Sequence, residues 1–200
     1  SGSDRLSPST FEPVKRRRNS ALLLSVLTFS AVMSGSSVAA AVPPSQSLFG
    51  GSVGVPTVGD SDPNAVELGV RFTPSVSGQV TGVRFVKTAG NTGVHTGSLW
   101  RASGARLATA TFSLESAAGW QTVRFAKPVS VTAGVPLIAS YFAPRGRYAA
   151  TPGYFTAART SGALTAAAGA NGVYSYGTTS QLPQQSYRST NYWVDVDFTP

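Results

Sequence analysis

Few side chains in this sequence of 200 residues could carry out catalysis, since it has eight acidic residues, one histidine and no cysteine. A glycosidase needs two carboxylates placed across the bond that it cleaves. Asp195 and Asp197 alternate on one face of a predicted final strand, about 7 Å apart along the backbone. Alternate acids on such a strand are usually solvent-exposed surface residues. We favour that interpretation for this pair.

A serine hydrolase would have to use His95, because the sequence contains no other histidine. No G-x-S-x-G nucleophile elbow accompanies it, and a lone strand histidine beside Thr96 more often makes structural hydrogen bonds. The absence of cysteine excludes thiol nucleophiles, zinc–thiolate sites and iron–sulfur clusters. We therefore expect a non-catalytic protein with no cofactor, and an uncharacterised hydrolase is the alternative.

One short segment resembles the start of a calcium-binding loop. Asp60, Asp62 and Asn64 have the i, i+2, i+4 spacing of such a loop. The match then fails, because Ala65 takes the place of the required glycine and Arg71 that of the required glutamate. Asp and Asn beside proline are also common turn residues, so we expect a turn here, with calcium as the weaker alternative.

The chain is basic, with 16 Lys and Arg against 8 Asp and Glu. Beyond residue 41 it keeps 11 basic and 6 acidic residues. The basic residues are scattered singly along predicted strands, which is typical of ordinary solvated faces. Weak attraction to an anionic cell-wall polymer is the alternative. Without a recognisable motif, the charge does not predict a nucleic-acid partner.

Aromatic residues are numerous, with three Trp, seven Tyr and ten Phe. Sugar rings present apolar faces that stack on aromatic planes, so exposed aromatics are typical of carbohydrate-binding surfaces. Two tryptophans lie on strand faces opposite to inward-facing valines, and two tyrosines lie in or beside turns. We therefore predict that carbohydrate or a cell-wall polymer binds through Trp120, Tyr148, Tyr154 and Trp193. Alternatively, the two tryptophans cover a second sheet or an edge.

The first 41 residues have the order of a signal peptide. Residues 15–18 are basic, residues 21–33 are apolar, and residues 38–41 are small; this order is typical of export by the general secretory route. The apolar segment gives about 20 Å of helix, which is shorter than the roughly 30 Å hydrocarbon core. We thus expect a secreted or cell-surface protein without a stable membrane span, with residues 42–46 as a linker.

The rest of the chain must position these residues on β-strands. Residues 66–72 alternate strictly between apolar and other residues, which marks a half-buried strand. Pro and Gly residues separate further segments of this kind, and no helical period appears beyond the leader. The sequence predicts an all-β domain over residues 47–200: a single antiparallel β-sandwich, jelly-roll-like, of about 8–10 strands. These strands are expected near residues 66–72, 78–87, 94–101, 107–114, 119–131, 136–143, 172–177 and 187–199, with a loop over 159–172.

A set of collinear motifs supports a family resemblance: VELGVRF (66–72), GQVTGVRFVK (78–87), NTGVHTGSLW (91–100), LATATF (107–112), GWQTVRF (119–125), VTAGVPLIASYFAP (131–144), YAATPGYF (148–155), NGVYSYG (171–177) and NYWVDVDF (191–198). Together they resemble the bacterial family catalogued as domain of unknown function 4082. The resemblance implies an exported module, often found beside immunoglobulin-like, fibronectin-like or polysaccharide-active modules. The resemblance identifies no catalytic residues in this chain. A structural or adhesion spacer in a larger surface protein is therefore the alternative to a binding module.

Overall fold

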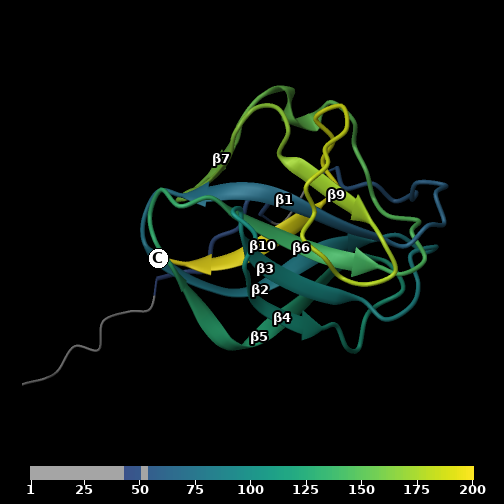
Figure 1. Ribbon diagram of the computed structural model, residues 1–200, viewed down its shortest axis with the longest axis horizontal. Coiled ribbons are helices and arrows are strands. Elements are labelled where there is room, and N and C mark those ends of the chain that lie inside the picture. The colour runs from purple at the N-terminus through teal and green to yellow at the C-terminus, as the bar shows by residue number, and fades with distance from the viewer. Residues whose placement is uncertain (1–42, 51–53) are drawn as a thin grey trace, which may run out of the picture. The chain divides into compact units, whose positions relative to one another are not determined.

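Two antiparallel β-sheets pack against each other in a sandwich-like arrangement, as Figure 1 shows for the computed structural model. The structure describes residues 43–50 and 54–200. In these residues there are ten strands and one short 3-10 helix, and no α-helix. Within the same part of the chain, no helix is long and apolar enough to span a bilayer. The all-β, sandwich-like fold predicted from the sequence is confirmed.

The elements follow in chain order: β1 Val66–Pro74, β2 Gly78–Lys87, β3 Thr96–Arg101, β4 Arg106–Thr111, β5 Gly119–Val131, β6 Leu137–Ala143, η1 Tyr154–Thr156, β7 Arg159–Ser161, β8 Leu164–Ala166, β9 Gly172–Tyr176 and β10 Val194–Thr199. Seven strands form the larger sheet, in the order β4-β3-β6-β1-β8-β7, with β9 also paired to β1. The smaller sheet has the order β10-β2-β5. The apolar run of β6 lies between β3 and β1, which is the central position expected of so apolar a strand.

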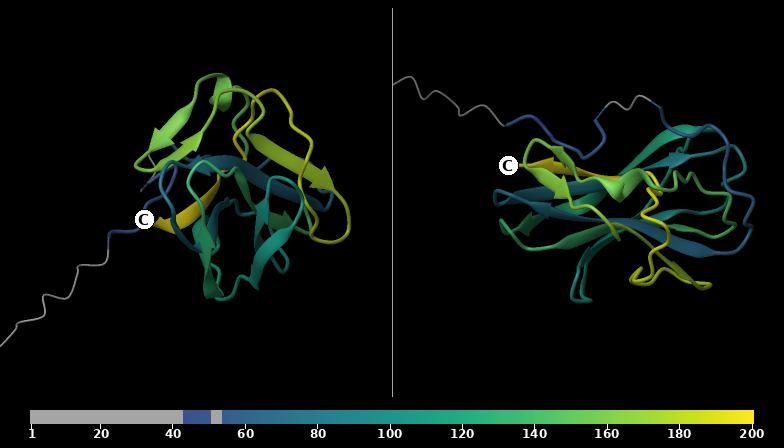
Figure 2. Two further views of the ribbon diagram at one scale, coloured as in Figure 1. Left: turned by 60° about the vertical axis from the view of Figure 1, so that its left-hand side comes forward. Right: turned by 90° about the horizontal axis from the view of Figure 1, so that it is seen from above.

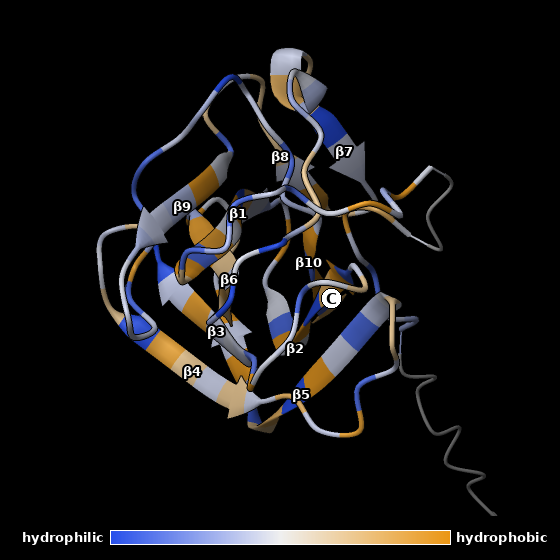
Figure 3. Ribbon diagram, turned by 90° about the vertical axis from the view of Figure 1, so that its right-hand side faces the viewer, coloured by the Kyte–Doolittle hydropathy of each residue, from blue (hydrophilic) through white to orange (hydrophobic). Residues whose placement is uncertain are grey.

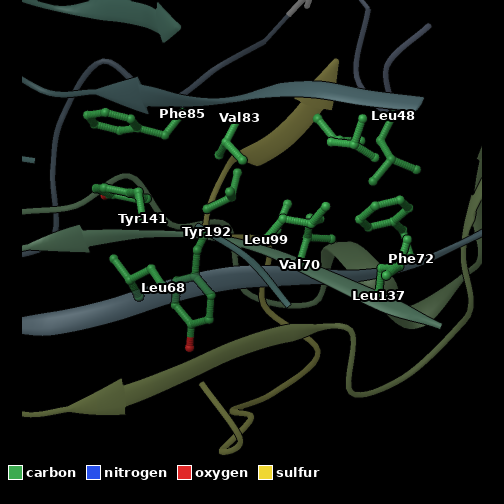
Figure 4. Packing of buried hydrophobic residues seen from close by; sticks show 14 of the residues in the cluster. Leu48, Leu68, Val70, Phe72, Val83, Phe85, Leu99, Leu137, Tyr141 and Tyr192 are labelled. Carbon is green, nitrogen blue, oxygen red and sulfur yellow. The ribbon is translucent and has the colours of Figure 1, made fainter. Parts of the chain in front are cut away.

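The core lies between the two sheets and is built from the inward positions of the alternating strands. Figure 3 shows the alternation of hydrophilic and hydrophobic residues along β5. In the core, the rings of Phe85 on β2 and Tyr141 on β6 stack with their centroids 3.9 Å apart. Leu68, Phe72 and Leu99 fill the neighbouring space, as Figure 4 shows. Burial of these side chains holds the sheets together, because the hydrophobic contribution to folding scales with the apolar area removed from water.

Two predictions about strands are wrong. Residues 159–172, predicted as a loop, contain the short β7–β8 hairpin, which forms one edge of the larger sheet (Figure 2). The strand predicted over residues 187–199 begins only at Val194. Arg188, Ser189 and Trp193 have positive φ angles, and a left-handed residue interrupts the extended backbone that a strand requires. Sequence alternation cannot reveal such backbone kinks.

The segment before β1 packs against β10 and β2 through the Asp195 side chain. Its carboxylate accepts hydrogen bonds from the backbone N–H groups of Leu48 and Phe49, at 2.7 and 3.1 Å. Asp195 is fully buried, so its prediction as a solvent-exposed surface residue is wrong. Within the predicted linker, Gln46 forms a β-bridge with Phe198. The predicted signal peptide, residues 1–41, lies outside the described residues.

Candidate functional site

One pocket formed by the described residues is lined mainly by tyrosines. It has a volume of about 290 Å³. Five of the seven tyrosines of the chain contribute to its wall. The lining residues are Asp60, Tyr148, Ala150, Pro152, Tyr174, Tyr176, Tyr187, Thr190 and Tyr192. We call this hollow the tyrosine pocket. Tyr176 and Tyr187, the two aromatic members of the exposed large hydrophobic residues in the described part of the chain, both belong to it.

Four segments that are distant in sequence bring the tyrosine pocket together. They are the turn before β1, the segment after β6, strand β9 and the segment before β10. Backbone hydrogen bonds connect these segments: Asp60 N–H donates to the carbonyl of Tyr148 at 2.8 Å, and Thr151 and Asn191 exchange two hydrogen bonds of 2.9 and 3.0 Å. Tyr174 and Gln185 exchange a second such pair, of 2.8 and 3.0 Å. The pocket is therefore held by main-chain pairing outside the regular strands.

The tyrosine rings meet edge to face. The rings of Tyr148 and Tyr192 are 5.8 Å apart at an angle of 76°. Tyr192 and Tyr174 are 6.1 Å apart at 71°, and Tyr174 and Tyr176 are 5.6 Å apart at 73°. Edge-to-face contacts are a favourable arrangement of aromatic quadrupoles. A run of rings that are each nearly perpendicular to the next forms a concave aromatic wall.

Backbone conformations of high energy are concentrated next to the pocket. Of the five non-glycine residues with positive φ in the described chain, four adjoin pocket residues in sequence: Arg147, Arg188, Ser189 and Trp193. Such conformations cost about 1–3 kcal/mol each and are typical of functional sites. A Cβ atom on Gly172 would lie 1.6 Å from the carbonyl oxygen of Thr190, so close packing of β9 against the segment before β10 requires glycine there.

Acidic groups border the pocket on one side. The Tyr176 hydroxyl donates a hydrogen bond of 2.5 Å to Asp62 Oδ2. Burial tends to raise the pKa of Asp62, but hydrogen bonds from Tyr176, Asn64 and Tyr148 outweigh it and hold this pKa below its ordinary value. Burial raises the pKa values of the Tyr148 and Tyr192 hydroxyls, and the negative charge of Asp60 raises them further. These hydroxyls thus stay protonated at physiological pH and can donate hydrogen bonds.

The segment predicted as a turn or a calcium loop forms two consecutive turns. Asp60 Oδ1 accepts a hydrogen bond of 2.8 Å from the N–H of Asp62, and Asp62 Oδ1 accepts one of 2.9 Å from the N–H of Asn64. These are the side-chain-to-backbone bonds that make Asp common in turns. In residues 43–50 and 54–200, no group of three His, Cys, Asp or Glu residues is placed to hold a metal ion. Calcium binding at Asp60, Asp62 and Asn64 stays a prediction.

The four aromatic residues predicted as an exposed binding surface do not form one surface. Tyr148 lines the tyrosine pocket but is only 8% exposed. Trp193 is 4% exposed, and it packs with half-buried Tyr154 against Phe49, with ring centroids 5.5 Å and 5.8 Å from that of Phe49. Trp120 is half-buried beneath the Arg84 guanidinium, which lies 4.5 Å from its ring centroid. The prediction of exposure is thus wrong for Tyr148 and Trp193, because the positive φ of Trp193 and the loop around Tyr148 turn both inward.

Sequence reasoning missed Tyr174, Tyr176, Tyr187 and Tyr192 as members of the site. Tyr174 and Tyr176 are two residues apart on β9 and so project to the same face of this strand. That spacing was the available signal, since it pairs two aromatics on one face of a short strand.

His95 lies away from the pocket lining, in a buried hydrogen-bond network. Its Nδ1 is 2.8 and 2.9 Å from the two carboxylate oxygens of Glu115, and its Nε2 is 2.9 Å from Asn91 Oδ1. Lys87 Nζ donates to Glu115 at 2.7 Å. In a Ser–His–acid triad, Nε2 faces the nucleophilic hydroxyl. Here the Asn91 amide takes that position. His95 therefore makes structural hydrogen bonds of the kind expected of a lone histidine.

Comparison with known families identifies the class of this domain. The model of the family described as domain of unknown function (DUF4082) matches residues 53–194. This match covers most of the chain, which therefore belongs to that family. Searches among curated proteins and among solved structures gave no match.

Proposed function

We propose that this chain is a secreted, non-catalytic module that binds carbohydrate in the tyrosine pocket. The observation that carries this proposal is the concave wall of edge-to-face tyrosine rings, which ends in the exposed side chain of Tyr176. The exposed side chain of Tyr187 also lines the pocket. An aromatic plane at the mouth of a pocket offers a surface on which the apolar face of a sugar ring can stack. The ligand is a polysaccharide or another cell-wall polymer.

Polar groups in the pocket support a sugar rather than a purely apolar ligand. Thr190 and Tyr192 both line the pocket, and their hydroxyls are hydrogen-bonding neighbours. The hydroxyls of Tyr148 and Tyr192 are protonated at physiological pH, because burial raises both pKa values. A sugar hydroxyl can accept a hydrogen bond from donors of this kind.

Size also favours a small ring or the end of a polymer. The pocket volume of about 290 Å³ is at the lower end of the roughly 300–1,000 Å³ found for small-molecule sites. A single sugar unit suits a space of this kind better than a large polycyclic ligand. The remaining units of a polymer would extend past Tyr176 into the solvent, because this side chain is 49% exposed.

The test is retention on a panel of insoluble plant, fungal and bacterial wall polymers, followed by calorimetry with soluble fragments of any polymer that binds. Tyr187→Ala and Tyr176→Ala remove exposed rings, so the fold should survive both. We expect each to weaken binding about tenfold, equivalent to about 1.4 kcal/mol. Val94→Ala and Leu114→Ala remove apolar side chains that are more exposed than these tyrosines and lie outside the pocket. Both should bind as the wild type does.

Two outcomes would contradict carbohydrate binding in the tyrosine pocket. If no polymer of the panel retains the protein, or if the two tyrosine variants bind as well as Val94→Ala, the proposed function is wrong. A structural or adhesion spacer would then be the better description, since a spacer tolerates loss of every exposed aromatic side chain.

A further inference from the structure

The tyrosine pocket has a charge opposite to that of the chain around it. Residues 43–200 contain 11 basic and 6 acidic residues. Nevertheless, the charged residue in the pocket lining is Asp60, and no Lys or Arg of the described chain lines the pocket. Asp62 lies directly behind the lining, bound to the hydroxyl of Tyr176. The pocket lining of a basic protein thus carries an acidic residue, while Arg188 lies over the Tyr187 ring at its mouth.

The other carboxylates of the described chain are occupied inside the protein. Asp195 pairs with Arg84, and Glu115 pairs with Lys87, both at 2.7 Å. Glu67 is buried and accepts a hydrogen bond from Ser140. Asp197 is half-buried on the smaller sheet and faces the charges of Arg84 and Arg124. Asp60 is different, because it is exposed at a pocket rather than paired with a cation.

Aromatic walls with a nearby carboxylate are suited to a cation. The face of a tyrosine ring attracts an ammonium or guanidinium group within about 6 Å of the ring centroid, and aromatic cages use this attraction to bind ammonium ligands. The mouth of this pocket already contains one such contact, because the Arg188 guanidinium lies 5.8 Å from the centroid of the Tyr187 ring. Nearly perpendicular rings, as in Tyr148, Tyr192 and Tyr174, can surround a cation on more than one side.

We infer that the sugar bound in the tyrosine pocket is an amino sugar whose free ammonium group lies among the tyrosine rings, next to Asp60. The inference rests on the proposed function and adds the chemical class of its ligand. A neutral N-acetylated sugar lacks the positive charge, and an anionic polymer would meet the carboxylates of Asp60 and Asp62. The ligand is therefore a polymer of free amino sugars, or a polymer that contains deacetylated units.

The experiment compares glucosamine oligomers with N-acetylglucosamine oligomers of the same length, by calorimetry with the folded protein. We expect the free-amine oligomer to bind about tenfold more tightly, with a preference that decreases as salt increases. Asp60→Asn keeps the side-chain oxygen that accepts the N–H of Asp62 but removes the charge. It should reduce the preference to about threefold or less. Asp197→Asn removes the same charge outside the pocket and should leave the preference unchanged.

Each outcome of the oligomer comparison supports or overturns the amino-sugar inference. Equal affinity for the two oligomers, or a preference that Asp60→Asn and Asp197→Asn change alike, overturns the inference and leaves carbohydrate binding intact. Binding of the N-acetylated oligomer alone also overturns the inference and supports the proposed function. If neither oligomer nor any wall polymer binds, both proposals are wrong. Competition by tetramethylammonium for the free-amine oligomer, lost in Tyr187→Ala, supports the aromatic site for the cation.

Discussion

The guanidinium of Arg84 and the carboxylate of Asp195 form an ion pair of 2.7 Å across the smaller sheet. The side chain of Asp195 is fully buried and that of Arg84 is 17% exposed. Arg84 also donates to the Ser47 hydroxyl and the carbonyl of Gly50, at 2.8 and 2.6 Å. One ion pair thus connects β2, β10 and the N-terminal segment of the described chain.

Loss of Arg84 should destabilise the fold strongly. Arg84→Met keeps much of the side-chain volume but leaves the Asp195 carboxylate buried without its cation, which typically costs about 3 kcal/mol or more. Urea unfolding at neutral pH measures the loss. Arg124→Met is the matched control on the same sheet, because Arg124 is exposed, donates a long hydrogen bond of 3.4 Å to Thr81 and faces only the half-buried Asp197. It should change the free energy of unfolding by no more than about 0.5 kcal/mol. Equal losses in the two variants would contradict the assigned role of the ion pair.

Strand alternation predicted the core of this fold because each of its strands carries its own pattern. The alternation in β1 and β2 is visible within each strand and needs no knowledge of its partners. Asp195 looked exposed because the groups that bury it are far away in sequence: Arg84 is 111 residues distant and Leu48 is 147 residues distant. Local periodicity reports which face of a strand a residue occupies, but not what covers that face.

The sequence pattern did not reveal the tyrosine pocket, for a related reason. Its residues come from segments without a repeating pattern, and long-range pairs such as Thr151–Asn191 bring them together. The positive φ angles at Arg188, Ser189 and Trp193 are equally invisible in the sequence, since the residue types that usually mark such conformations are Gly, Asn and Asp. Of the four aromatic residues predicted to bind carbohydrate, Tyr148 is the one that lines the pocket, and it is buried rather than exposed.

Glu67 should make the protein less stable as the pH rises. Burial raises the pKa of this carboxyl from 4.5 to about 7, against the opposing effects of the Ser140 hydroxyl and the Arg106 charge. Between these two pH values the folded state holds more protons than the unfolded state, so the free energy of unfolding falls as pH increases through this window. The total decrease is about 3 kcal/mol. Urea unfolding from pH 4.5 to pH 8 measures it.

The isosteric variant Glu67→Gln tests that assignment. Glutamine can still accept the hydrogen bond that Ser140 donates at 2.6 Å, but it does not titrate. We expect this variant to lose the decrease and to be more stable than the wild type at pH 8. Asp60→Asn removes an exposed carboxylate and should retain the decrease. If Glu67→Gln follows the wild-type pH profile, another group is responsible.

His95 should give the opposite dependence at lower pH. Burial lowers the pKa of its imidazole below 6.5, and this effect outweighs the attraction of Glu115, which raises the pKa. The unfolded state then binds the extra proton more readily, so stability is lost as the pH falls below about 6.5. The chain contains one histidine, so a single imidazole C2 proton signal reports the titration by NMR. We expect a midpoint below 6.5, and we expect Glu115→Gln to lower the pKa further. A midpoint at or above 6.5 in the wild type would contradict burial as the dominant cause.

Gly172 should tolerate no side chain. The Cβ atom of alanine at this position would lie 1.6 Å from the carbonyl oxygen of Thr190, a backbone atom that cannot move without shifting the segment before β10. Overpacking of this kind typically costs 1–3 kcal/mol and more against rigid backbone, so we expect Gly172→Ala to lose about 3 kcal/mol in the free energy of unfolding. At Gly90, by contrast, a Cβ atom would meet only the Arg147 side chain, at 3.3 Å. Gly90→Ala should therefore stay within about 1 kcal/mol of the wild type.

The same substitution should weaken ligand binding. Because β9 carries Tyr174 and Tyr176, any folded Gly172→Ala protein should bind the pocket ligand more weakly than Gly90→Ala. Full stability and unchanged binding in Gly172→Ala would show that β9 and the Thr190 segment are not packed as closely as described.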